Sequence, residues 1–326
     1  MFCYLLFKAH NTKSTLTHYK ENNDVSVMIR IIKNGTLLIK FAKAMRMHHW
    51  VKNMLVFLPV LTGHLANFEN LSLLLVLFLS LSFTASGMYL INDLLDIEND
   101  RKHPTKKFRA IASGSLSPKT AKVISILLIT MGLLGSFVTS FYGGILIFLY
   151  IVLVGVYSLY IKRIPFFEAF FLTFIYLLRI YMGLLVIDYK NMSLSAIIFS
   201  FFFFFLLVLV KRYTELSLYL QSTQKNPTGR GYKIEDLNLI QYLSVPCAIT
   251  SLVVVGLYIS SPKIQALYSA PVYLWGIILL GFLWILNLLI ITNKGEMEED
   301  PIVFAFTDRI SLLIFLLSLI LITLSI

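Results

Sequence analysis

Cysteine and charged residues are both scarce in this chain of 326 residues, and each scarcity excludes a class of protein. The two cysteines, Cys3 and Cys247, cannot build a disulfide framework, and no Cys/His cluster has the spacing of a zinc site. Only 14 % of the residues are charged, 58 % are hydrophobic, and the mean hydropathy is +0.80. A soluble protein of this size needs far more polar surface, so the composition predicts a multi-pass membrane protein.

Long apolar runs recur along most of the sequence. A membrane-spanning helix needs roughly 20 mainly apolar residues. Nine segments meet or approach this length, which predicts an all-α membrane protein with nine spans, the first of them interrupted by Pro59 and His64. The nine segments are 53–66, 71–92, 120–140, 144–161, 165–187, 193–210, 238–260, 271–292 and 309–326.

The first 46 residues differ from the rest. Residues 1–27 form a polar extension in which we find no signal-peptide core or cleavage site. Residues 28–46 alternate bases with apolar residues at helical spacing, which predicts a helix lying on the membrane surface. We therefore expect an N-terminal extension followed by one transmembrane domain over 28–326.

The formal charge of +11 admits two readings, nucleic-acid binding or membrane topology. Of the 28 lysines and arginines, 25 fall on one side of the predicted spans, whereas Lys190 and Lys263 fall on the other and Arg179 lies within a span. This asymmetry favours topology over nucleic acid, and it predicts a plasma (inner) membrane protein with a cytosolic N-terminus. Three long polar loops are then cytosolic: 93–119, 211–237 and 293–308.

The segment NDLLDIEND, which begins at Asn92, carries three aspartates at helical spacing. At 100° per residue, Asp93, Asp96 and Asp100 fall within about 60° of one helix face, whereas Glu98 points away. Like charges on one face repel one another, so a compensating cation is expected. Oxygen ligands without His or Cys suit Mg²⁺, which usually completes its shell with substrate phosphate oxygens. The three aspartates are therefore the catalytic and metal-binding candidates, with Asn92 beside them.

A run of bases follows the aspartates directly. A diphosphate bridged by Mg²⁺ to the carboxylates, with its remaining charge held by these bases, would use both halves of the segment. The alternative is a solvated, charge-balanced loop. The bases are Arg101, His103, Lys106, Lys107 and Arg109.

Two other polar groups belong to the same predicted side. Lys52 and Asn53 stand at the start of the first span, where Lys52 is placed to reach phosphate or, alternatively, to snorkel beside Trp50. Lys211 and Glu215 end the sixth span at i, i+4 spacing, which also fits a simple helical ion pair.

Three further polar residues are candidates for substrate binding. Arg230 and Tyr232 share the loop that follows the sixth span. Arg179 lies inside the fifth span, three helical turns from Glu168, and charges within a membrane usually face a cavity or a partner.

These motifs together resemble the UbiA-type intramembrane prenyltransferase superfamily, over nearly the whole chain from about residue 45. NDLLDIEND matches its NDxxDxxxD signature. Within the superfamily, the chain is most similar to the polyprenyl-phosphate phosphoribosyltransferase branch. The motifs that carry this similarity are HWVKNMLVFLP, DRKHPTKKFRAIASG, YSLYIKRIPFFEAF, LLRIYMG, KRYTEL and RGY.

The resemblance implies helices around a lipid-open cavity, and transfer of 5-phosphoribosyl from phosphoribosyl pyrophosphate to a polyprenyl phosphate. It implies that Lys211, Arg212 and Glu215 form a second site, with Glu215 among the metal ligands. The chain departs from the family where Ala110 replaces a proline and where Glu168 replaces an aspartate. The sequence leaves the oligomeric state open.

The second site separates the two branches of this resemblance. Aromatic prenyltransferases carry a second acidic cluster there, whereas this chain has one carboxylate, Glu215, preceded by two bases. Extra bases suit a donor or an acceptor with an additional phosphate. Prenyl transfer from a polyprenyl diphosphate to an aromatic or other small acceptor remains the alternative. An ion-coupled transporter or inert scaffold is disfavoured, because most of the charge lies at one membrane surface and no repeated halves are visible.

Overall fold

A computed structural model of the chain describes residues 44–326 apart from 64, 104, 190–192, 223–225, 228 and 298–299. The predicted extension 1–27 and almost all of the predicted surface helix 28–46 lie outside the described residues. The described residues form helices and connecting turns without a β-strand, which confirms the all-α prediction.

Seven helical segments of the described chain are long and apolar enough to cross a membrane. The number rises to eight if α13 (Pro301–Thr307) and α14 (Arg309–Ser325), which meet at an angle of 75°, count as one broken span. The main helices of the seven segments are α4 (Phe68–Leu95), α6 (Pro118–Thr139), α7 (Phe141–Leu159), α8 (Phe167–Val186), α9 (Leu194–Ser222), α10 (Leu237–Ile259) and α12 (Trp275–Asn293).

The predicted count of nine is thus approximate: among the described residues, 53–66 does not form a helix of that length, and 309–326 reaches it only together with α13. The first of these two regions forms a 3-10 helix, η2 (Met47–Phe57), followed by the short α3 (Leu58–Gly63). Pro59 has no N–H to bond the Leu55 carbonyl, and it lies in the first turn of α3, where a missing N–H costs least. A 3-10 run of this length is unusual, because most such runs extend over only 3–4 residues.

Short elements complete the described chain at the ends of the long helices. They are α5 (Ile97–Lys102), η3 (Lys106–Phe108), η4 (Ile161–Arg163), η5 (Ile234–Asp236), α11 (Pro262–Leu267) and η6 (Pro271–Leu274).

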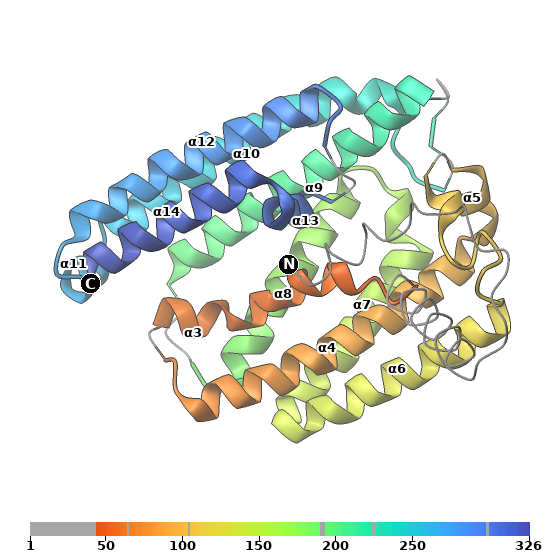
Figure 1. The fold of residues 1–326 in the computed structure, drawn as a ribbon, viewed down its shortest axis with the longest axis horizontal. Helices are drawn as coiled ribbons and strands as arrows, with labels where there is room; N and C mark the ends of the chain where they lie inside the picture. The colour runs from red at the N-terminus through yellow and green to blue at the C-terminus, as the bar shows by residue number, and fades with distance from the viewer. Residues whose placement is uncertain are drawn as a thin grey trace, which may run out of the picture. The chain divides into compact units, whose positions relative to one another are not determined.

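Helix α8 links two groups of long helices. It contacts α7 and α4 on one side and α9 on the other, while α9 packs on α10 and α12 (Figure 1). Its buried residues are divided between two apolar cores: Tyr176 and Ile180 join the core around α9, whereas Ile175 and Met182 join the core around α4 and α7. The residues of α8 are therefore held between both groups.

Helices α4 and α6 lie side by side because small residues line their contact (Figure 1). A Cβ atom added at Gly132 would meet the Thr84 side chain at 2.2 Å and the Ser80 carbonyl at 2.4 Å. Close approach through small residues is a common basis of helix packing in membranes, where the hydrophobic effect does not drive association.

The polar loops gather at one end of the helices, as their charge predicts. Ion pairs link the end of α4 to the end of α7, the loop after α5 to the end of α9, and the end of α9 to the start of α13. We call this end the motif end. The side of the membrane that it faces stays a prediction.

Candidate functional site

The three aspartates of NDLLDIEND lie at the break between α4 and α5. Helix α4 ends at Leu95, Asp96 has φ −103° and ψ 10°, and α5 starts at Ile97. Asp93 and Asp100 are buried, and Asp96 is partly buried. Glu98 is exposed and pairs with Arg101, so it points away as its spacing predicts.

Each of the three aspartates has a cationic partner. Arg109 bridges two of them, because its Nη1 donates to Asp93 at 3.2 Å and to Asp100 at 2.8 Å. The predicted spatial link between the carboxylates and the basic run is thus present. Lys162, from η4, donates to both oxygens of Asp96 at 2.6 and 2.7 Å.

Arg46, one residue before η2, pairs with Asp93 from outside the motif. Arg46 and Lys162 were not among the predicted site residues. The sequence places Arg46 in the predicted surface helix. Lys162 lies inside the motif YSLYIKRIPFFEAF, and this motif could have indicated it as a site residue. Asn92 is half-buried beside Asp93.

Glu215, on α9, is the centre of a second cluster. Lys106 pairs with it from the loop after α5, and Arg212 pairs with it from one turn earlier on α9. Arg230 Nε lies 3.0 Å from Glu215 Oε2. The predicted residues Lys106, Arg212, Glu215 and Arg230 therefore meet, although they lie up to 124 positions apart in the sequence.

Glu168, at the start of α8, extends this cluster into the protein. Its side chain is fully buried and accepts a hydrogen bond from the Tyr157 hydroxyl at 2.8 Å. Arg212 Nε lies within ion-pair distance of Glu168 Oε1, although the two atoms are not aligned for a hydrogen bond. Arg230 lies 3.6 Å from the other oxygen of Glu168. Two arginines thus contact two carboxylates, Glu168 and Glu215.

His103 is held beside Glu215 in a defined orientation. Its Nδ1 accepts the backbone N–H of Thr105 at 3.2 Å and of Lys106 at 3.3 Å, so the ring proton belongs on Nε2. Nε2 is buried, lies 3.8 Å from Glu215, and forms no hydrogen bond within the described chain. A polar substrate atom between Nε2 and Glu215 would satisfy it.

A third cluster surrounds Asp300, which the sequence reasoning missed. Lys52 from η2 and Lys211 from α9 both pair with this carboxylate, Lys211 at 2.9 Å. Asp300 also caps α13 by accepting the Ile302 N–H. In the sequence, Asp300 is followed by Pro301, a pattern typical of a helix start. This pattern does not indicate that Asp300 pairs with Lys52 and Lys211.

Arg179 and Asn53 meet inside the protein. Arg179 Nε donates to Asn53 Oδ1 at 3.1 Å, and its Nη2 donates to the Tyr150 hydroxyl at 3.2 Å. The guanidinium also lies over the rings of Tyr150 and Tyr176. No carboxylate of the described chain pairs with Arg179. It therefore faces polar and aromatic partners, and Glu168 is not one of them.

Two predicted residues have other surroundings. Arg101 is exposed and bonds Glu98 and the Ala112 carbonyl, apart from the three clusters. Tyr232 is buried, and its hydroxyl accepts the backbone N–H of Phe166, which has a positive φ of 59°. Tyr232 thus supports the turn before Glu168.

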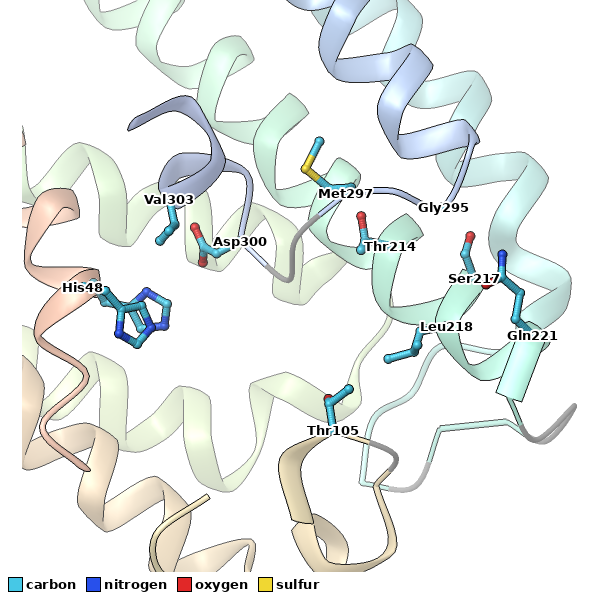
Figure 2. Close-up of a pocket in the computed structure, with 11 residues that line it drawn as sticks. His48, Thr105, Thr214, Ser217, Leu218, Gln221, Gly295, Met297, Asp300 and Val303 are labelled. Atoms are coloured by element: carbon cyan, nitrogen blue, oxygen red, sulfur yellow. The ribbon is translucent and has the colours of Figure 1, made fainter. Parts of the chain in front are cut away.

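A cavity of about 480 Å³ is lined by Asp300 of the third cluster and by Thr105 and Thr214, the sequence neighbours of Lys106 and Glu215 (Figure 2). Asp300 and His48 lie toward one end of it, and Thr105 and Gln221 toward the other (Figure 2). Its walls come from η2, the loop after α5, α9 and the segment before α13. The lining residues are His48, His49, Thr105, Thr214, Ser217, Leu218, Gln221, Gly295, Met297, Asp300 and Val303.

Burial and charge shift several pKa values in opposite directions. Burial raises the pKa of Asp100, although Arg109 opposes the shift. Burial lowers the pKa of Lys106 to about 8, although Glu215 opposes that shift. For Asp300, burial acts upward, but the charges of Lys211 and Lys52 outweigh it and hold the pKa well below its ordinary value. Asp300 is therefore ionised at neutral pH.

The donor set at the α4–α5 break fits a magnesium ion in chemistry. Its three carboxylates provide the hard oxygen ligands that Mg²⁺ prefers. Within the described residues, no three His, Cys, Asp or Glu side chains converge as they would around a metal, and cationic side chains lie against the aspartates.

Comparisons with known proteins agree with this architecture. The model of the UbiA prenyltransferase family matches residues 55–310. A UbiA homologue from Archaeoglobus fulgidus, solved bound to GPP and Mg²⁺, superposes with a TM-score of 0.63 at 16 % identity, covering 87 % of this chain and 99 % of that one.

Three relatives are similar in sequence. The Sinorhizobium fredii protein y4nM is 30 % identical over 82 % of this chain, and the nodulation protein NoeC of Azorhizobium caulinodans is 28 % identical over 83 %. The decaprenyl-phosphate phosphoribosyltransferase of Mycobacterium tuberculosis is 32 % identical over 56 % of this chain. The matches span 52 %, 88 % and 62 % of these relatives, respectively. Because the family model matches most of its length, this chain belongs to the UbiA prenyltransferase family and is an integral-membrane transferase.

Proposed function

We propose that the protein transfers the 5-phosphoribosyl group of phosphoribosyl pyrophosphate to a polyprenyl phosphate and releases pyrophosphate. The observation that carries this proposal is the excess of bases in the second cluster, where Glu168 and Glu215 meet Lys106, Arg212 and Arg230. If the second cluster instead bound a metal–diphosphate, it would need more acidic than basic side chains. The similarity to the mycobacterial decaprenyl-phosphate phosphoribosyltransferase supports the same reaction.

The aspartates hold the leaving group in this proposal. Asp93, Asp96 and Asp100 would hold Mg²⁺, which would supply positive charge to neutralise the diphosphate. Glu215, which the resemblance also places among the metal ligands, lies among bases and serves mainly to position them. Arg109 and Lys162, now paired with the aspartates, are placed to bind the diphosphate oxygens.

The reaction breaks the bond between the anomeric carbon and the diphosphate oxygen, and the diphosphate leaves with the electron pair. An oxygen of the acceptor phosphate forms the new bond to the same carbon. Because this phosphate is already an anion near neutral pH, the step needs no strong general base. Fixed cationic groups stabilise the negative charge that develops on the leaving diphosphate. Low water access would protect the activated sugar from hydrolysis.

The second candidate is prenyl transfer from a polyprenyl diphosphate to an aromatic or other small acceptor. The chain has aromatic side chains whose faces can stabilise a carbocation, although Arg179 already lies over the rings of Tyr150 and Tyr176. A fold relative was solved with GPP and Mg²⁺ bound, which is consistent with this chemistry in that protein.

One assay separates the two candidates. Purified full-length protein is incubated with labelled phosphoribosyl pyrophosphate and undecaprenyl phosphate, with and without EDTA. We expect label in the lipid fraction only when Mg²⁺ is present. Absence of such transfer, together with prenylation of an aromatic acid from a prenyl diphosphate, would contradict the proposal.

We further propose that the motif end faces the cytosol of a plasma (inner) membrane. The distribution of lysine and arginine supports this orientation. A cysteine introduced at the exposed Lys119 should resist an impermeant thiol reagent in intact cells and react after lysis.

A further inference from the structure

The third cluster carries more positive charge than its one carboxylate compensates. Lys52 and Lys211 share Asp300, and Lys52 and Asp300 are both nearly fully buried. Asn53, adjacent to Lys52, holds Arg179, which has no carboxylate partner in the described chain. Lys52 and Lys211 thus share one carboxylate, and a third cation, Arg179, is bonded to the residue next to Lys52. Buried charge of one sign is costly unless a partner of the other sign is bound.

An unsatisfied donor or acceptor at the cavity wall marks the same place. His49 lines the cavity with Asp300, and its Nδ1 is buried without a hydrogen-bond partner in the described chain. His49 and Lys52 are three residues apart in the 3-10 helix η2, so they share one face. Burial and then the charge of Lys52 keep the pKa of His49 far below its ordinary value, so its ring is neutral.

A phosphate monoester has the matching chemistry. It carries a charge of about −1.5 to −2 near pH 7 and three terminal oxygens. Two lysines provide strong point-charge contacts to such a group, and a neutral histidine can provide a hydrogen bond. The ion pairs of the described residues place one carboxylate, Asp300, against Lys52 and Lys211, whereas three carboxylates lie near one another at the α4–α5 break.

We propose that Lys52 and Lys211, with Arg179 behind them, form a metal-independent site for the phosphate monoester group of one substrate, and that Asp300 holds the site in the absence of this group. Asp300 keeps the two lysines in place and is displaced from them when the phosphate binds. The ligand chemistry has two sources, the phosphate of a lipid acceptor or the 5-phosphate of the sugar donor. The assignment of the phosphate to a lipid acceptor or a sugar donor rests on the proposed function. The existence of the phosphate site does not.

The test is direct binding to the purified full-length protein in detergent with EDTA present. Farnesyl phosphate represents the lipid source and ribose 5-phosphate represents the sugar source, and both are titrated calorimetrically. We expect one of the two to bind the wild-type protein. Lys211→Gln should weaken this binding by about tenfold, the size of one charged hydrogen bond. Lys119→Gln, an exposed lysine remote from the cavity, should leave it unchanged.

The affinity of the Asp300→Asn variant for the monoester is the decisive measurement, because the proposal predicts an increase. Asparagine also caps helices well, so α13 should remain intact while the competing negative charge is removed. We expect the phosphate monoester to bind several-fold more tightly to this variant. Misfolding would produce the opposite effect. Failure of both probes to bind the wild-type protein, or weaker binding to Asp300→Asn, would overturn the proposal.

The outcomes also separate this site from the reaction. Asp96→Asn should bind the monoester as the wild type does in EDTA, because no metal takes part. Arg179→Gln should weaken binding, whereas Arg163→Gln, an exposed arginine, should not. If the monoester binds with this pattern but no phosphoribosyl transfer is detected, the proposed function fails and the site stands.

Discussion

The aspartate segment and the Glu215 cluster use the same kinds of side chain in different proportions. Asp93, Asp96 and Asp100 face Arg46, Arg109 and Lys162, so acids and bases are balanced there. Around Glu168 and Glu215 the bases exceed the acids by one. A divalent ion entering the first region would free its bases for an anion, whereas the second region already has cationic charge available. One end of the protein thus combines a charge-balanced cluster with a cluster that has an excess base.

The largest expected effect concerns the balanced region. Asp96→Asn should lower kcat by about 10³-fold, because the metal loses a charged ligand and the leaving group loses its counter-charge. The measurement is phosphoribosyl transfer at several Mg²⁺ concentrations. Glu98→Gln, which alters an exposed carboxylate two residues away, is the matched control and should retain activity. Near-normal turnover of Asp96→Asn would remove the metal assignment.

Breaking the buried pair of the second region should affect folding as well as activity. Glu168→Gln leaves Arg212 and Arg230 beside one remaining carboxylate, and loss of a partner from a buried pair destabilises by about 3 kcal/mol. Glu168→Asp keeps the charge but shortens the reach, and should destabilise less. Thermal unfolding in detergent compares the two variants. Equal melting temperatures for Glu168→Gln and the wild type would show that the pair adds no stability.

Removing one base from the second region should weaken substrate binding without changing the metal requirement. Arg230→Gln should raise KM for phosphoribosyl pyrophosphate about tenfold, because a charged hydrogen-bond donor is lost. The apparent Mg²⁺ affinity should stay constant, in contrast to Asp96→Asn. Arg163→Gln serves as the exposed control. A shift in Mg²⁺ affinity instead of KM would contradict the assignment of metal binding to the aspartates and of substrate binding to the Glu215 cluster.

The smallest expected effect is on pH dependence. Burial lowers the pKa of Lys106 to about 8, so this base loses its charge as the pH rises through that value. The kcat/KM for the donor should therefore decline several-fold above about pH 8. Lys106→Arg stays protonated over this range and should shift the decline to higher pH. An unchanged pH profile in Lys106→Arg would exclude Lys106 as the titrating group.

Much of the fold was predictable from composition and the lengths of apolar runs. The long helices α4, α6 and α7 lie close to their predicted segments, because about 20 apolar residues have few other stable arrangements in a membrane. The segment 53–66 does not form one long α-helix among the described residues. Its backbone adopts a 3-10 helix before Pro59, and no hydropathy pattern distinguishes a 3-10 helix from an α-helix.

The sequence predicted the types of side chain in the candidate site, but only some of the residues that form it. The pairing of Arg109 with Asp93 and Asp100 follows from nearness in sequence, because these residues share one turn-rich segment. Lys162 and Asp96 are 66 residues apart, and Lys52 and Asp300 are 248 residues apart. Contacts of this range depend on which helix ends become neighbours, and one sequence does not encode that in a local pattern.

By itself, the sequence determined that the chain spans a membrane as helices and that its charges collect in the loops between them. It also predicted one helix face for three aspartates, although the structure interrupts the helix at Asp96, between α4 and α5. Only the tertiary structure decided which cation lies against each carboxylate, and that two lysines from distant helices share Asp300. The physical reason is that charges pair through space over a few ångströms, and the packing of apolar helices sets those distances.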